Sequence, residues 1–116
     1  MISEETVAQV ATLLPQPDRS VLAIAPQGTG PGTWAGAPSA ARGDEEIYLA
    51  YRLRRPQGRG RGYAVVVARS ADGVHFETML TIGREELGAE SLERPAIVRA
   101  PDGKIGRASC RERVWR

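Results

Sequence analysis

The feature of this sequence that most constrains its fold is a short internal repeat. Residues 36–42, Gly-Ala-Pro-Ser-Ala-Ala-Arg, match residues 93–99, Glu-Arg-Pro-Ala-Ile-Val-Arg. Pro38 aligns with Pro95, which sets the period of the repeat, and an aspartate follows each copy at nearly the same offset. Repeated units of this length bury their faces by stacking on one another. The repeat therefore favours four-stranded β units with connectors, as in propellers.

Between the two copies, the sequence predicts four short antiparallel strands. The expected strands are residues 38–42, 47–52 with an extension to 54, 63–70 and 75–82. The third is rich in valine and other apolar residues, which is typical of a buried strand. Gly43-Asp44 and Asp72-Gly73 supply turns, and residues 55–62 form a hairpin loop rich in arginine and glycine.

The segments on either side of this unit have different patterns. Residues 3–14 predict a helix, because Ser3 can cap its first turn and apolar residues recur at helical spacing. A short apolar run at residues 20–25 predicts a strand, and a helical turn is expected at residues 84–87. The expected organisation is an N-terminal helix and strand (1–25), a Gly/Pro-rich loop (26–36), a first blade (37–82), a connector (83–92), the start of a second blade (93–104) and a tail (105–116).

The tail breaks the repeat. Where the first copy continues into an aromatic strand, residues 105–116 have no strand alternation and carry four arginines, which are unsuited to a blade interior. Residues 105–114 resemble the translation of one reading frame of a common sequencing adapter. This resemblance predicts a non-native tail and a native chain truncated near Lys104. The alternative is a native basic tail that binds nucleic acid or a partner. Without the tail, the net charge changes from +2 to −1, so the basic character of the chain depends on it.

Composition argues against several classes of protein. No apolar run approaches the roughly 20 residues of a membrane span, and the acidic N-terminus lacks a signal-peptide pattern. We therefore expect a soluble, cytoplasmic protein without a membrane partner. Cys110 is the sole cysteine and His75 the sole histidine, so no internal disulfide is possible and neither residue suggests a metal or cofactor site.

Four segments together resemble a known superfamily. They are residues 34–39 (Trp-Ala-Gly-Ala-Pro-Ser), 47–52 (Ile-Tyr-Leu-Ala-Tyr-Arg), 68–76 (Ala-Arg-Ser-Ala-Asp-Gly-Val-His-Phe) and 93–97 (Glu-Arg-Pro-Ala-Ile). Over residues 34–104 the chain resembles the five-bladed β-propellers of arabinanases, levansucrases and invertases, with the related mannoside phosphorylases. The resemblance implies an all-β fold with a short N-terminal helix, in which the chain is the first blade and the start of the second blade of a truncated propeller. Because such a piece has open edges, we expect it to fold poorly or aggregate when expressed alone.

The resemblance implies a parent protein that cleaves or transfers glycosidic bonds with paired carboxylates. In this superfamily, the first-blade carboxylate is an aspartate directly before the motif proline, and Ala37 occupies that position here. The general acid lies in a later blade, outside this chain. We therefore expect no catalytic residues and no activity in the chain as it stands.

Three residues are candidates for contacting the carbohydrate. Trp34 would stack on a sugar ring or belong to the core, and Glu93 and Arg94 would contact sugar groups or form an exposed ion pair. A noncatalytic propeller that binds a glycan or a protein is the alternative function. A small basic RNA-binding protein is a third. The arginines that gather around the 55–62 loop are Arg52, Arg54, Arg55, Arg59 and Arg61. A solvated hairpin tip without nucleic acid is the expected state of this cluster. The glutamates at 85, 86, 90 and 93 suggest either a cation site or a solvated connector.

Overall fold

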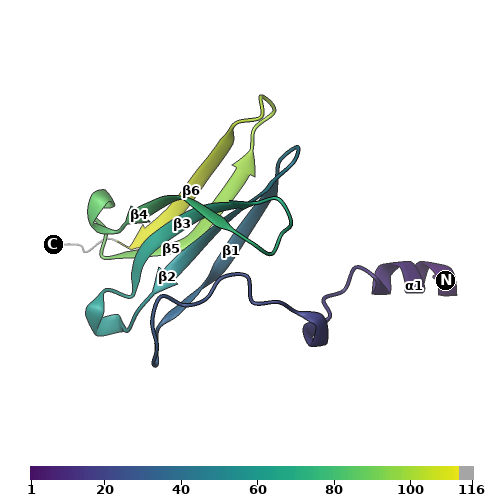
Figure 1. Ribbon diagram of the computed structural model, residues 1–116, viewed down its shortest axis with the longest axis horizontal. Coiled ribbons are helices and arrows are strands. Elements are labelled where there is room, and N and C mark those ends of the chain that lie inside the picture. Colours follow the sequence, from purple (N-terminus) through teal and green to yellow (C-terminus); the bar gives the residue numbers. More distant parts are fainter. Residues whose placement is uncertain (113–116) are drawn as a thin grey trace.

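The computed structural model describes residues 1–112, and most of their regular secondary structure is β-strand (Figure 1). A four-stranded antiparallel sheet has the order β1 (Trp34–Arg42), β2 (Ile47–Arg54), β3 (Gly62–Ser70) and β4 (Glu77–Gly83). A second, two-stranded antiparallel sheet consists of β5 (Ser91–Arg99) and β6 (Ile105–Glu112). A mostly β fold with one short helix agrees with the fold class expected from the sequence at this coarser level.

The internal repeat is also a repeat of strand pairing. The β1–β2 hairpin closes with Arg42 opposite Ile47, and the β5–β6 hairpin closes with Arg99 opposite Ile105. The two hairpins therefore correspond strand for strand, although the loop of the second is slightly longer. Both β1 and β5 carry a bulge beside the motif proline, where the register of the ladder shifts. A proline cannot donate a ladder hydrogen bond, which explains why the irregularity recurs at this point of the motif.

Residues 105–112 form a strand although their sequence lacks strand alternation. They form β6, which pairs with β5 from Arg99 opposite Ile105 to Ser91 opposite Glu112. Ladder hydrogen bonds use backbone groups, so a segment without side-chain alternation can still pair once a tight turn returns the chain. That turn holds a hydrogen bond of 2.8 Å from Ala100 N to Lys104 O. Residues 113–116 of the expected tail lie outside the described residues.

The N-terminal segment differs from the sequence prediction in two places. The helix α1 (Glu4–Ala11) has the expected Ser3 cap, whose hydroxyl accepts a hydrogen bond from Thr6 N, but it ends before residue 14. All of its residues are exposed, and Figure 1 shows it projecting away from the sheets. Residues 20–25 do not form the expected strand. They run alongside the first sheet but do not pair with any of its strands. A 3₁₀ turn (Pro17–Arg19) precedes them.

The connectors match the expectations more closely. A 3₁₀ turn at Glu85–Leu87 lies where a helical turn was expected, and another at Gln57–Arg59 lies within the arginine-rich loop. Asp72-Gly73 forms the expected turn between β3 and β4, with Gly73 at φ 78°. These short elements bring the loops that follow β2 and β4 to the same end of the sheets.

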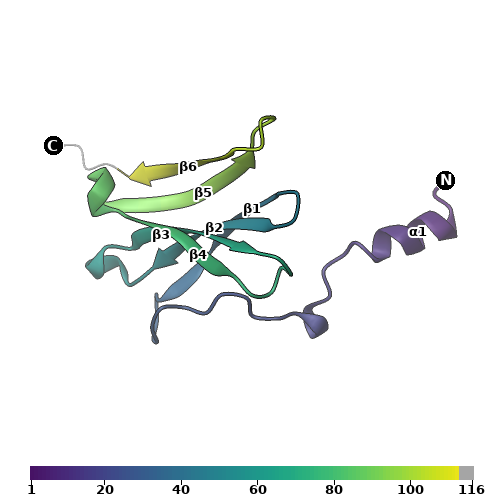
Figure 2. The same ribbon diagram turned by 45° about the horizontal axis from the view of Figure 1, so that its top comes forward.

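Both faces of the first sheet are partly covered: β5 and β6 lie on one side, and the N-terminal segment runs along the other (Figure 2). On one face, Tyr51, Val66 and neighbouring side chains form a core cluster against which Ile24 of the N-terminal segment packs. On the other face, Ala50 and Val67 pack against Ile97 of β5. A sheet covered on both sides needs apolar residues at successive positions, which accounts for the unbroken apolar run in β3.

Candidate functional site

The two ends of the sheets carry opposite charge. Residues 52–62 and 83–94 gather at the end where β2 finishes and β5 begins, and we call this the arginine end. It contains seven arginines and four glutamates, a net charge of +3. The turn regions at the other end, residues 42–46, 69–77 and 99–104, contain six carboxylates and four Lys or Arg residues, a net charge of −2 with histidine neutral. The expected contact residues Glu93 and Arg94 belong to the arginine end, and Trp34 lies beside it, opposite Arg54.

A partly buried ion pair between Arg52 and Glu93 lies at the centre of the arginine end. Arg52 Nη1 is 2.5 Å from Glu93 Oε2 and also donates to the carbonyl of Leu92 at 3.3 Å. The Arg52 side chain is 10% exposed and that of Glu93 is 36% exposed. Because a buried charge is costly without a partner, this pair ties the end of β2 to the start of β5.

Arg52 was expected to belong to a solvated hairpin tip, but its side chain is buried. Strand alternation explains the difference: Tyr48, Ala50 and Arg52 share the face of β2 that β5 covers, so Arg52 is buried with Ala50. Alternation along residues 47–54 would have assigned Arg52 to one sheet face, but which face a second sheet covers depends on the tertiary fold.

A hydroxyl group also forms a hydrogen bond with the Glu93 carboxylate. Ser91 Oγ donates to Glu93 Oε1 at 3.1 Å and accepts from the backbone N–H of Gly62 at 3.0 Å. Arg61 Nη2 lies 3.6 Å from the same carboxylate oxygen. Both oxygens of Glu93 are therefore held by neighbouring groups, and the carboxylate has a fixed orientation at the arginine end.

Two glycines of the arginine-rich loop have a packing reason. A Cβ on Gly62 would lie 2.1 Å from the carbonyl oxygen of Leu92, so only glycine lets β3 approach β5 this closely. Gly60 has φ 82°, in the left-handed region, and a Cβ there would lie 2.6 Å from Cζ of Arg84. Gly60 and Gly62 thus let the backbone of the loop lie close to the connector and to β5.

Trp34 is half-buried and faces two cations. The guanidinium carbons of Arg52 and Arg54 lie 5.0 and 5.2 Å from the ring centroid, a distance typical of cation–π contacts. The ring also lies over Gly36, where a Cβ would be 2.7 Å from a ring carbon. Trp34 therefore joins the site mainly by positioning arginines, and the same ring is packed against the start of β1.

The other two residues singled out from the sequence lie on the strand bulges. Arg94 is exposed and belongs to the bulge of β5. Ala37, at the position of the superfamily aspartate, lies in the bulge of β1 with φ 51°. Left-handed backbone is unfavourable for alanine and less so for aspartate or asparagine, whose side chains can bond locally. The bulge geometry is thus one that an aspartate would tolerate better than the residue present.

A polar pocket of about 450 Å³ opens beside this network. It is lined by Arg59 and Arg61 of the loop, by Arg84 and Glu90 of the connector and by Ser91. Arg84 Nη1 donates to the carbonyl of Glu90 at 2.9 Å, which holds the guanidinium in place. No local sequence pattern connects Arg84 with the loop arginines, because β3 and β4 separate them along the chain.

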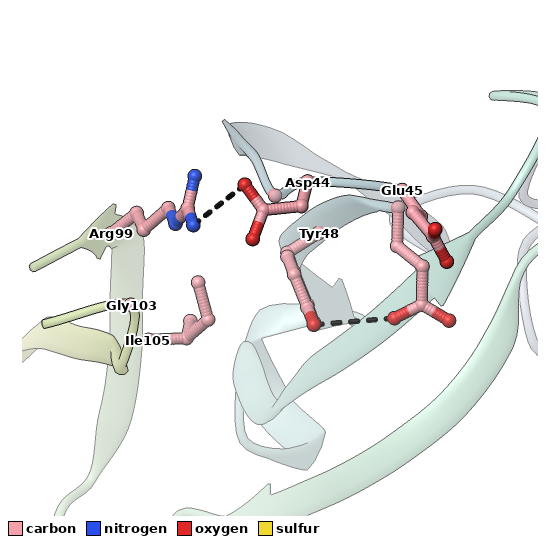
Figure 3. Close-up of a pocket in the computed structure, with 8 residues that line it drawn as sticks. Asp44, Glu45, Tyr48, Arg99, Gly103 and Ile105 are labelled. Atoms are coloured by element: carbon pink, nitrogen blue, oxygen red, sulfur yellow. Dashed lines mark hydrogen bonds and ion pairs between the residues drawn. The ribbon is translucent and has the colours of Figure 1, made fainter.

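The opposite end of the sheets has a different character, shown in Figure 3. A pocket of about 420 Å³ lies between the two hairpins, where Arg99 Nη2 is 2.9 Å from Asp44 Oδ1 and Tyr48 donates to Glu46 at 3.2 Å. The Asp44 side chain is 83% exposed, and exposed ion pairs of this kind are weak. This pocket joins the hairpins of the two sheets but offers no strongly buried polar group among the residues described.

The hydrogen bonds of the β3–β4 turn give Asp72 a structural role. One carboxylate oxygen accepts hydrogen bonds from Val74 N and His75 N, both at 2.8 Å, and the other lies 2.6 Å from His75 Nδ1. The bond with His75 is the main reason that the pKa of Asp72 is well below its usual value, and Asp72 raises the pKa of His75. Elsewhere, burial raises the pKa of Tyr51, partly offset by a hydrogen bond with Thr78.

Among the described residues, no group of three or more His, Cys, Asp or Glu side chains is arranged to hold a metal ion. The glutamates of the connector therefore do not form such a group. No helix within residues 1–112 is long and apolar enough to cross a membrane. Comparison with known protein families, curated proteins and solved structures finds no match for this chain.

Proposed function

We propose that this chain is the first blade and the beginning of the second blade of a five-bladed, carbohydrate-active β-propeller, and that the chain alone binds carbohydrate without catalysis. The observation that carries the proposal is the repeated strand–bulge–hairpin unit, which sets Arg42 opposite Ile47 in one copy and Arg99 opposite Ile105 in the next. Stacking of the second copy on the first is the arrangement by which propeller blades bury their faces.

The placement of polar residues supports a binding site at the arginine end. The first strands of both copies, β1 and β5, begin there, and they bring Trp34 and Glu93 to the same end. Arg52 links the two, since it lies against the Trp34 ring and pairs with Glu93. Fixed carboxylates and guanidiniums are suited to hydrogen bonds with sugar hydroxyls.

Ala37 is the reason for proposing binding without catalysis. Glycosidases use two carboxyl groups on opposite faces of the scissile bond, and a methyl group provides neither an acid nor a nucleophile. Glu93 is an alternative carboxylate at this end, but its oxygens are already held by Arg52 and Ser91. We therefore assign the described residues at this end to the orientation of a sugar, and we assign no pair of carboxyl groups to glycosidic bond cleavage.

Saccharide titrations monitored by fluorescence test this proposal. The sequence has two tryptophans, so a Trp115→Phe background leaves Trp34 as the reporter. We expect oligosaccharides to change its emission in a saturable way, and we expect no release of aglycone from aryl glycosides. Glu93→Gln should weaken the binding, whereas Glu45→Gln at the opposite end should not. Turnover lost on Glu93→Gln would contradict the noncatalytic assignment, and an unresponsive Trp34 with every saccharide would contradict the binding site.

A noncatalytic propeller that binds a protein is the second candidate. The observation in its favour is the apolar groove between β4 and the second sheet, where Met79 and Leu80 are 50% and 38% exposed. Apolar surface of this kind is typical of protein contacts, but the same groove is where further strands of a second blade would pack. The truncated-propeller proposal accounts for the groove without a separate partner.

A further inference from the structure

We propose that the ligand of the arginine end is an acidic saccharide, whose carboxylate or sulfate group binds in the pocket formed by Arg59, Arg61 and Arg84. This inference rests on the carbohydrate-binding function proposed above and names the chemical class of the ligand. The pocket has a volume of about 450 Å³, within the size range of small-ligand sites.

The charge balance around the pocket favours an anion. Three arginines and one glutamate line it, and the arginine end as a whole has a net charge of +3. Guanidinium groups bind planar or tetrahedral oxyanions through paired N–H donors, which a neutral sugar does not satisfy. The Arg59 side chain is exposed on the loop and can turn towards a ligand, while its backbone is fixed by a bond of 2.9 Å from Arg59 N to Pro56 O.

The pocket is also preorganised. Arg84 is held by its bond to the Glu90 carbonyl and by the close approach of Gly60, and its Nε is buried without a hydrogen-bond partner among the described residues. Arg61 lies within 3.6 Å of Glu93, which orients it from the other side. Side chains that are fixed before binding lose less conformational entropy when the ligand arrives.

Two observations favour a saccharide over RNA as the source of the anion. Nucleic-acid sites that follow a single strand combine basic residues with open aromatic faces on which bases stack. Here the Trp34 ring lies beneath Arg52 and Arg54, and the Tyr63 ring lies 4.6 Å from the guanidinium of Arg55. In addition, the carboxylates of the connector and of β5 can accept hydrogen bonds from hydroxyl groups, of which a saccharide offers more per residue than RNA does.

The test compares four probes by calorimetric titration of the full chain. The probes are hexagalacturonate, a heparin-derived hexasaccharide, neutral xylohexaose and hexauridylate, at about 50 and 200 mM salt. We expect at least one acidic saccharide to bind about tenfold more tightly than both xylohexaose and hexauridylate. We also expect Arg59→Gln to remove about tenfold of that affinity and not to change the binding of xylohexaose. Arg42→Gln, which removes the same charge at the opposite end, is the matched control and should have no such effect.

The outcomes separate this inference from the function on which it rests. If xylohexaose binds as tightly as the acidic probes, carbohydrate binding stands and the acidic class is wrong. If no saccharide binds, both are wrong. Tightest binding of hexauridylate overturns the inference in favour of nucleic acid. Equal losses in Arg59→Gln and Arg42→Gln would show general charge attraction and overturn the assigned pocket. Because Arg59 is exposed, its substitution should leave folding intact, as a circular dichroism spectrum can verify.

Discussion

The groove between β4 and the second sheet should make this chain self-associate, and charges placed in the groove should prevent it. The groove has a volume of about 390 Å³ and is lined by Met79 and Leu80 of β4, together with Ile97 and Ile105 of the second sheet. It lies beside the outer edge of β6, which has no further strand among the described residues. An apolar groove next to an open strand edge is a surface on which a second chain can dock.

The expected effect follows from the exposed fractions. Met79 is 50% exposed and Leu80 is 38% exposed. Complete burial of such a side chain stabilises by about 1.5–3 kcal/mol, so covering the remaining surface contributes about 1 kcal/mol for each. A symmetric pair of chains covers two such side chains from each copy, which amounts to about 4 kcal/mol. The double variant Met79→Lys/Leu80→Lys should therefore weaken dimerisation about a thousandfold.

Sedimentation velocity over a concentration series from the micromolar range to about 0.2 mM measures this association. The unmodified chain should shift to larger species as the concentration rises, and the double variant should remain monomeric. Val74→Lys, at an exposed position in the β3–β4 turn outside the groove, is the matched control and should behave as the unmodified chain. A monomeric unmodified chain throughout, or a double variant that associates equally well, would show that the groove does not drive association.

Three further results are expected. Ala37→Gly should raise the free energy of unfolding by about 1 kcal/mol, because glycine relieves the strain of the left-handed backbone at φ 51°. Ala40→Gly in the same strand should lower the free energy of unfolding. Urea unfolding measures both changes, and changes of the same sign in the two variants would contradict the strain at Ala37. Gly62→Ala should loosen the contact between the two sheets, because the added Cβ would lie 2.1 Å from the carbonyl oxygen of Leu92. The loosened contact should be seen as faster amide hydrogen exchange in β5. An unchanged exchange rate would count against the close approach. In an NMR titration, the pKa of His75 should lie above 6.5 and should fall in the variant Asp72→Asn. Because this pKa is raised in the folded state, any stability from the pair is present below the unfolded pKa and is lost as the pH rises through the folded pKa. An unchanged His75 titration in the variant would disprove the pairing.

Much of the first sheet could be predicted from local patterns. Alternation and β-branched residues located β2 and β3, and Asp72-Gly73 located the turn before β4, because these features act over a few neighbouring residues. The cap at Ser3 was predicted for the same reason. Residues 20–25 were misread because an apolar run identifies a segment that will be buried or paired, but not whether a partner strand is within reach.

β6 is the clearest case in which pattern alone misled. Its residues lack alternation, yet the preceding turn and the backbone of β5 are sufficient to pair it. Pairing depends on backbone groups that every non-proline residue carries, so side-chain patterning underestimates the strand content beside an existing edge. The interpretation of residues 105–114 as an adapter-like tail concerns their origin and stays a prediction.

The sequence by itself was enough to establish the repeat that aligns Pro38 with Pro95 and to predict the strand-rich unit between its copies. It also singled out Trp34 and Glu93 as candidate contact residues and Ala37 as the residue at the position of the superfamily aspartate. The three-dimensional arrangement was needed to show that Arg52 is buried against Glu93 and that an arginine of the connector joins the loop arginines in one pocket. The physical reason is that periodicity is a property of neighbouring residues, whereas burial and charge pairing depend on which faces and ends meet when the second sheet stacks on the first. Residues 40 positions apart become partners through that stacking, and no local pattern records it.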